Sequence, residues 1–167
     1  IAGPIVRANE LIGQLSNKQR FNADSFLRGL DLIVVGAFKK VIIADQLAPF
    51  VDKIYAAPQG LGSGVLMLGV YAYAIQIYCD FSGYTDIGRG CALCLGYKLP
   101  RNFTRPYLSC NIAEFWRRWH ITLSSWLRDY LYIPLGGNRK GKIGTYVNLM
   151  ITMTLGGLWH GASWCFV

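Results

Sequence analysis

Two histidines stand forty positions apart in this sequence, His120 in WRRWH and His160 in GGLWHG, and the chain has two histidines in all. An imidazole titrates near neutral pH, so it can take a proton from a reacting hydroxyl group and return it to a leaving group. Burying such a ring without a partner costs roughly 1–3 kcal/mol, so a histidine inside an apolar run needs a reason. The pattern predicts that both rings do chemistry in a membrane enzyme.

The apolar run around His160 extends from Ile143 to Val167 and contains no formal charge. Gly156-Gly157 and Gly161 flank the Trp159-His160 pair. Because glycine has no side chain, backbone or ligand can approach the ring closely there.

His120 belongs to a segment that begins with Asn111-Ile-Ala-Glu114, the form of a helix-starting capping box. At about 100° per residue, one continuous helix would carry its apolar side chains in one stripe and place His120 at the edge of that stripe. This predicts an amphipathic helix at the membrane interface, ended by Pro134 and Gly136-Gly137. The stripe would contain Phe115, Trp116, Trp119, Leu123, Trp126, Leu127, Tyr130 and Leu131.

The composition favours a membrane protein, with 53% hydrophobic and 16% charged residues, against about 25% charged in soluble domains. The net charge is +8, and the window from Lys98 to Lys142 has nine Lys and Arg against two acidic residues, which leaves +7. These basic residues lie between two apolar spans, as in the cytoplasmic loops of membrane proteins, and this arrangement argues against nucleic-acid binding.

The remaining segments predict further helices. Ile1–Asp24 is expected to be a connection with one short amphipathic turn, and a helix is expected from Ser25, closed by Pro49 and Pro58. The uncharged stretch Leu61–Cys79 is long enough to cross the roughly 30 Å hydrocarbon layer. Its small residues, Gly62, Gly64, Gly69, Ala72 and Ala74, would admit close helix packing.

Charged and sulfur-containing side chains follow that span. Asp80 and Asp86 arrive at its end and are expected to pair with Arg89 or with the basic segment beyond. The five cysteines form no complete zinc pattern, because Cys91-x-x-Cys94 lacks a second pair. We therefore expect small buried thiols and no metal site.

The blocks FWRRWHITLSSWLRDYLYIPLGGNRKGK and NLMITMTLGGLWHGASW resemble the membrane-bound O-acyltransferase (MBOAT) family. IAGPIVR, FKKVIIADQLAP and CDFSGYTDIGRG are similar to its bacterial alginate O-acetyltransferase-like branch. Family members are much longer, so residues 1–167 are expected to be the central part of a single MBOAT membrane domain, truncated at both ends.

The resemblance implies an all-α fold, a multi-pass membrane helical bundle in the bacterial inner membrane. It implies transfer of an acetyl or other acyl group from a cytoplasmic thioester donor, acetyl-CoA or an acyl carrier, for O-acetylation of an exopolysaccharide such as alginate. The acyl group would pass to an extracytoplasmic partner acyltransferase, and the donor would be a substrate, with no cofactor bound. His160 matches the family's catalytic histidine and His120 the second histidine of the bacterial branch. Arg117 and Arg118 are candidates for attracting the anionic donor.

Two other classes of function stay open. A transporter or exporter would use the same polar residues to line a pathway and would need no thioester. A non-catalytic scaffold of a polysaccharide secretion complex would keep working after both histidines were changed.

Overall fold

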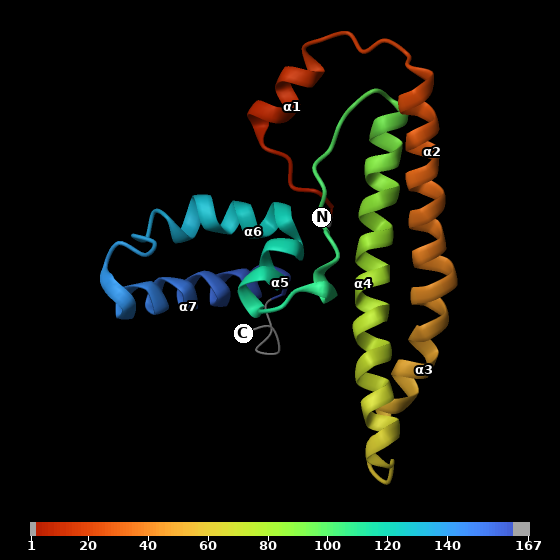
Figure 1. Cartoon of the computed structure of the whole chain (residues 1–167), viewed down its shortest axis with the longest axis vertical. Coiled ribbons are helices and arrows are strands. Elements are labelled where there is room, and N and C mark those ends of the chain that lie inside the picture. The colour runs from red at the N-terminus through yellow and green to blue at the C-terminus, as the bar shows by residue number, and fades with distance from the viewer. Residues whose placement is uncertain (1–2, 162–167) are drawn as a thin grey trace. The chain divides into compact units, whose positions relative to one another are not determined.

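The computed structural model describes residues 3–161, and every regular element in that range is helical, which confirms the all-α prediction (Figure 1). The chain divides after Asn102 into two compact units, which are described separately below. The end of the predicted apolar run, 162–167, lies outside the described residues, and Cys165 lies there.

The first unit is a long antiparallel helical hairpin preceded by a short helix (Figure 1). A helix with a π-helical segment in its middle forms one arm, and it runs without a break from Ala23 to Ala56 beside the second arm. The elements are α1 (Ala8–Leu15), α2 (Ala23–Ala37), the π-helical η1 (Phe38–Ala44), α3 (Asp45–Ala56) and α4 (Ser63–Cys94).

Local sequence signals explain one end of the first arm and fail within it. The Asn22 side chain accepts a hydrogen bond from the Ser25 backbone N–H at 2.8 Å and starts α2. The prediction that Pro49 ends the helix is wrong, because Pro49 lies inside α3, whose Val51 and Ile54 are buried. Packing of this face offsets the one backbone donor that proline lacks. The helix ends before Pro58, as predicted.

The second arm is longer than predicted. We expected a helix over Leu61–Cys79 with Asp80 at its end, but α4 has 32 residues and continues to Cys94. At 1.5 Å per residue it is about 48 Å long. No proline interrupts this stretch, and the two aspartates are paired with lysines of the first arm, so the helix continues through them.

Glycines bring the two arms into backbone contact. Gly29 lies opposite Gly90, and Gly36 lies opposite Gly83. A Cβ built on Gly83 would stand 2.6 Å from the Gly36 carbonyl oxygen, and one built on Gly90 would stand 2.5 Å from the Gly29 oxygen. The seven-residue spacing on both arms places each pair on the same face, as in close-packed membrane helices. Of the small residues predicted for this role, Gly69 and Ala72 are buried, whereas Gly62 and Gly64 meet open space.

Ion pairs join the arms next to these glycines. Lys39 Nζ lies 2.7 Å from Asp86 Oδ2, and Arg89 binds the other oxygen of the same carboxylate at 3.1 Å. Lys40 Nζ lies 2.6 Å from Asp80 Oδ1. The predicted pairing of Asp86 with Arg89 is confirmed, and the lysine partners come from the π-helical segment. The charges of Asp80 and Asp86, which follow the uncharged stretch, are therefore matched within the hairpin.

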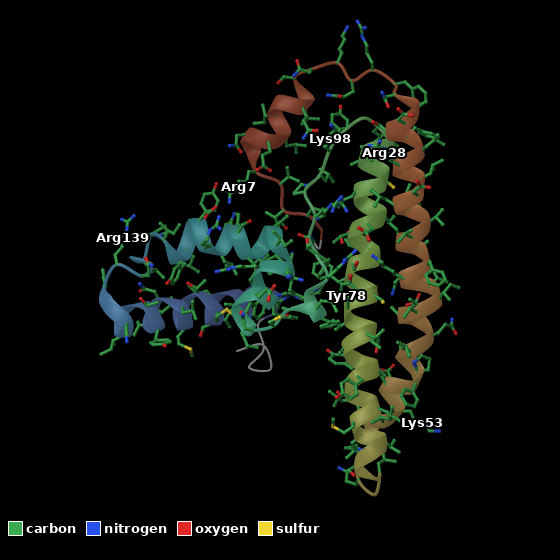
Figure 2. All side chains as sticks on the ribbon, viewed as in Figure 1. Arg7, Arg28, Lys53, Tyr78, Lys98 and Arg139 are labelled. Atoms are coloured by element: carbon green, nitrogen blue, oxygen red, sulfur yellow. The ribbon has the colours of Figure 1, made fainter. Side chains whose placement is uncertain are left out.

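One helix among the described residues, α4, is long and apolar enough to cross a membrane by length and composition. Much of the apolar surface of the hairpin is exposed, including Val34, Leu68 and Tyr71. Lys53 and Arg28 lie toward opposite ends of the hairpin in Figure 2.

Within residues 103–161, the second unit contains three helices, one 3₁₀ turn and one π-helical segment. Its elements are η2 (Pro106–Leu108), α5 (Ile112–Arg118), α6 (Ile121–Leu127), the π-helical η3 (Arg128–Tyr132) and α7 (Gly141–His160). The continuous amphipathic helix predicted here is wrong, because the chain leaves helical geometry at Trp119 and His120. The predicted helix end near Pro134 is confirmed, and a turn leads into α7.

Candidate functional site

His120 occupies the break between α5 and α6. Its backbone is left-handed, with φ 41° and ψ 55°, after an extended Trp119. A left-handed conformation is uncommon for a residue with a side chain and is found often at functional sites. The residue is 4% exposed, so the sequence-based placement at a stripe edge understated its burial.

An aromatic cluster holds the break in place. The Trp119 ring packs edge-on against the Phe103 ring, with 5.0 Å between the ring centroids, and stacks on the Phe115 ring, with 5.6 Å between the centroids. The Thr104 backbone N–H also donates to the Arg118 carbonyl at 3.0 Å. Phe103 and Thr104 lie before α5, so their tertiary contacts override the periodicity that would continue the helix.

His160 is the last residue of α7 and is exposed. Its ring makes an edge contact with Trp159, with 5.1 Å between the ring centroids. Gly156 lies one turn before His160 and has no side chain, which leaves room for Leu127. A Cβ built on Gly156 would stand 3.2 Å from Leu127 Cδ1. This contact packs α7 against α6.

The two histidines lie at the same end of one helical hairpin. α6 and η3 form its first arm, the turn after Tyr132 reverses the chain, and α7 forms its second arm (Figure 1). His120 precedes the first arm and His160 ends the second, so the open end of the hairpin carries both rings. Arg139 lies at the opposite, closed end (Figure 2). The structure therefore brings together the two residues that the sequence singled out.

Burial and His160 set the protonation state of His120. Burial, with a smaller contribution from the charge of His160, lowers the pKa of His120 from 6.5 to about 4. At pH 7 the His120 ring is therefore neutral, with one nitrogen able to donate a hydrogen bond and the other to accept one. A neutral ring can orient a hydroxyl group or accept its proton.

This pKa shift predicts a loss of stability in acid. The unfolded chain binds a proton at His120 below pH 6.5, whereas the folded chain does not until about pH 4. Stability is therefore present above pH 6.5 and falls as the pH decreases toward 4, by about 3 kcal/mol. Thermal unfolding of the detergent-solubilised protein at pH 7 and pH 4 checks this, with His120→Gln as the control. An equal decrease in both proteins would contradict the assignment to His120.

The two arginines proposed for donor binding lie in the last turn of α5. Arg118 forms an ion pair with Glu114, whereas the Arg117 residue is exposed. The Cys110 backbone N–H donates to the Glu114 carboxylate at 2.8 Å, and this bond, followed by Arg118, lowers the pKa of Glu114. The predicted capping box is confirmed in part, because Asn111 accepts from the Glu114 N–H while Glu114 accepts from the residue before Asn111.

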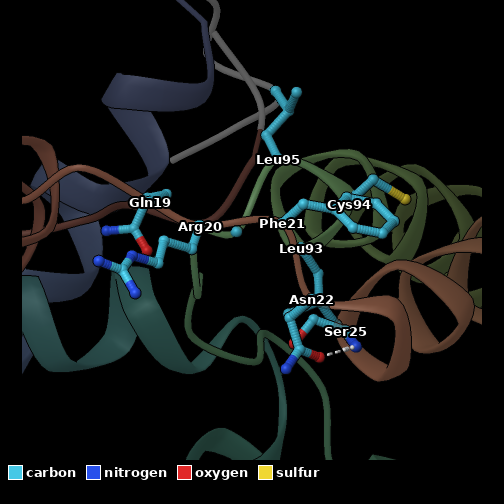
Figure 3. A pocket seen from close by; sticks show the side chains of 9 residues that line it. Gln19, Arg20, Phe21, Asn22, Ser25, Leu93, Cys94 and Leu95 are labelled. Atoms are coloured by element: carbon cyan, nitrogen blue, oxygen red, sulfur yellow. Dashed lines mark hydrogen bonds between the residues drawn. The ribbon is translucent and has the colours of Figure 1, made fainter.

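The first unit contains a cavity of about 180 Å³ where α2 begins and α4 ends (Figure 3). Arg20, Asn22 and Cys94 line it, but Asn22 is used in capping α2. The expectation of buried thiols is wrong for Cys91 and Cys110, which are exposed, and correct for Cys79. Within residues 3–161, no three His, Cys, Asp or Glu side chains are grouped as metal ligands would be.

Sequence reasoning missed Asn148 in α7. Its side chain is buried and donates a hydrogen bond to the Gly137 carbonyl at 2.9 Å. The available signal was an amide side chain inside an uncharged run, where a polar group needs a partner.

Known proteins match this chain over its whole length. The chain is 50% identical over 167 residues to a probable alginate O-acetylase of Azotobacter vinelandii, covering all of this chain and 33% of that protein. It is 46% identical over 169 residues to a peptidoglycan O-acetyltransferase of Helicobacter pylori, covering 32% of that protein. It is also 31% identical to a teichoic acid D-alanyltransferase of Bacillus subtilis, over 97% of this chain and 43% of that protein.

The chain thus spans about a third of the length of the curated O-acetylating relatives it matches. The model of the membrane-bound O-acyltransferase family matches residues 1–167, which include both histidine blocks. The resemblance predicted from these blocks is confirmed, and the chain belongs to the membrane-bound O-acyltransferase family.

Proposed function

We propose that this chain carries the histidine pair of a membrane O-acyltransferase that passes an acetyl group from a cytoplasmic thioester donor across the inner membrane for O-acetylation of an exopolysaccharide such as alginate. The observation that carries the proposal is the placement of both histidines at the open end of one hairpin, close enough for the charge of His160 to lower the pKa of His120. The names of the relatives support the O-acetyl chemistry.

In the proposed reaction, His160 takes the proton of an acceptor hydroxyl group, and the hydroxyl oxygen attacks the thioester carbonyl carbon. The carbon–sulfur bond then breaks, and the thiolate takes the proton from His160. The products are an ester and a free thiol, with no net change in protons. His120, neutral at pH 7, positions the acceptor by hydrogen bonding.

The donor is anionic if it is coenzyme A or a phosphopantetheine carrier, so a basic surface near the pair favours its approach. Arg117 suits this role better than Arg118, because Arg118 is already paired with Glu114. We also propose that the protein is multi-pass and that α7 lies against lipid. The exposed apolar side chains of α7 support this, among them Val147, Met150 and Leu155.

The full-length enzyme would lie in the bilayer and would act with an extracytoplasmic acyltransferase that receives the acyl group. The longer relatives support a larger membrane domain around residues 1–167, which would be its central part.

Inverted membrane vesicles containing the full-length protein test the proposal. With labelled acetyl-CoA as the donor probe, we expect release of free CoA that depends on the protein and stops when the thioester is replaced by a non-cleavable thioether. Polymer movement that requires this protein and continues without any thioester would contradict the transferase and support the exporter. Acetylation of the polymer that persists after both histidines are changed would support the scaffold.

A further inference from the structure

The closed end of the histidine hairpin contains a buried polar contact that the reaction does not use. The Asn148 side chain, 7% exposed, donates to the Gly137 carbonyl at 2.9 Å. Gly137 is buried and left-handed, with φ 55°, and belongs to the turn that joins the two arms. The hydrogen bond therefore joins the turn to the second arm.

A second contact defines the alignment of the arms. Leu127 in the first arm lies against Gly156 in the second. Leu127 is ten residues before Gly137, part of that interval being the turn, and Gly156 is eight residues after Asn148, so the two contacts lie along the same pair of antiparallel arms. Both contacts therefore belong to one register, and the apolar contact alone would also accept a neighbouring leucine after a slip of one turn, about 5.4 Å.

The same register determines how the histidines meet. His120 is seven residues before Leu127, and His160 is four residues after Gly156, which is about 10 Å and about 6 Å along their helices. A slip of one arm would move one ring past the other by a full turn. The hydrogen bond from Asn148 to Gly137, unlike the apolar contact, is specific for one register. In any other register a buried carbonyl and a buried side-chain amide would be left unpaired, which costs free energy.

We propose that Asn148 is a positioning residue whose hydrogen bond to the Gly137 carbonyl sets the register of the hairpin and thereby the placement of His120 against His160. This inference rests on the proposed function only for its effect on activity. The register itself can be measured without any substrate.

Cross-linking in the full-length protein measures the register directly. With the native cysteines replaced by serine, Leu127→Cys with Gly156→Cys reports the observed alignment, and Leu131→Cys with Gly156→Cys reports a one-turn slip. We expect Asn148→Ser, whose hydroxyl is too short to reach Gly137, to reduce the first cross-link several-fold and to increase the second. Asn148→Asp, which replaces the donor by an acceptor of the same shape, repeats the test if the serine variant does not accumulate.

The matched control is Asn138→Ser, the same change at an exposed asparagine of the adjacent turn. We expect it to leave both cross-links unchanged. If Asn148→Ser and Asn148→Asp cross-link like the parent protein, the proposal is wrong.

Kinetics with acetyl-CoA then separate positioning from binding. We expect Asn148→Ser to lower kcat about 100-fold, because a displacement of this size misaligns the reacting groups. KM for acetyl-CoA should change less than about twofold. If His160→Ala abolishes CoA release while Asn148→Ser leaves kcat unchanged, the positioning role fails and the proposed function stands. If His160→Ala is fully active, the proposed function fails whatever the cross-linking shows.

Discussion

Replacing His160 by alanine is expected to remove O-acetyl groups from the secreted polysaccharide while the polymer itself is still secreted. A positioned general base contributes roughly 10²–10⁴-fold to a rate, so residual acetylation should fall by about a thousandfold. The measurement is the O-acetyl content of the polymer from cells that carry the full-length protein, compared at equal membrane levels.

The control for this experiment is chemical. Because His160 is exposed at the end of α7, added imidazole can reach the space left by the alanine. Partial recovery of CoA release in vesicles would support proton transfer by the ring. Unchanged acetylation would contradict the catalytic assignment, and loss of polymer secretion with normal acetylation of the remainder would favour the exporter.

The second large effect concerns the fold of the first unit. Gly83→Ala would place a methyl group 2.6 Å from the Gly36 carbonyl oxygen, and the backbone of the neighbouring helix cannot move aside without separating the arms. We expect a loss of about 3 kcal/mol and a decrease in Tm of roughly 10 °C, measured on detergent-solubilised protein.

Gly88→Ala is the matched control, because it lies in the same helix and a Cβ there meets nothing within 4 Å. Alanine is a better helix former than glycine, so this variant should be neutral or more stable by up to about 1 kcal/mol. Equal Tm values for the two variants would show that the close contact between the arms contributes little.

Local signals in the sequence predicted the helix starts well. The helix expected from Ser25 begins two residues earlier, at Ala23, and the capping residue predicted at Asn111 starts α5. The uncharged stretch before Asp80 does form a helix. Such features depend on neighbours in the chain, so the sequence displays them directly. The family resemblance rested on long blocks of residues and did not need the fold.

The failures came from contacts between distant residues. Pro49 is accommodated by packing against α4, and α4 continues past Asp80 because Lys40 neutralises it. The break at His120 depends on Phe103, which lies in a different segment. Gly29 and Gly36 are seven residues apart, as are Gly83 and Gly90, and this spacing is visible in the sequence. Which glycines pair depends on the hairpin, which the sequence does not show directly.

The residues of the candidate site were predicted, but their geometry was not. His120 and His160 were identified by type and surroundings, and the hairpin that joins them follows from the turn that contains Pro134. The burial of His120 and its lowered pKa could not be read from the sequence, because the break in the helix depends on contacts with Phe103 and Thr104. The catalytic roles of the two histidines stay predictions until the variants are measured.

The backbone of His120 has a consequence for how this protein trades stability against activity. At φ 41° glycine would have less backbone strain than histidine. A smaller or apolar side chain would also avoid the free-energy cost of burying an imidazole. Selection for stability alone would therefore remove histidine from this position. A chain that keeps the locally unfavourable residue there gives up some folding free energy in exchange for a ring held in one fixed place.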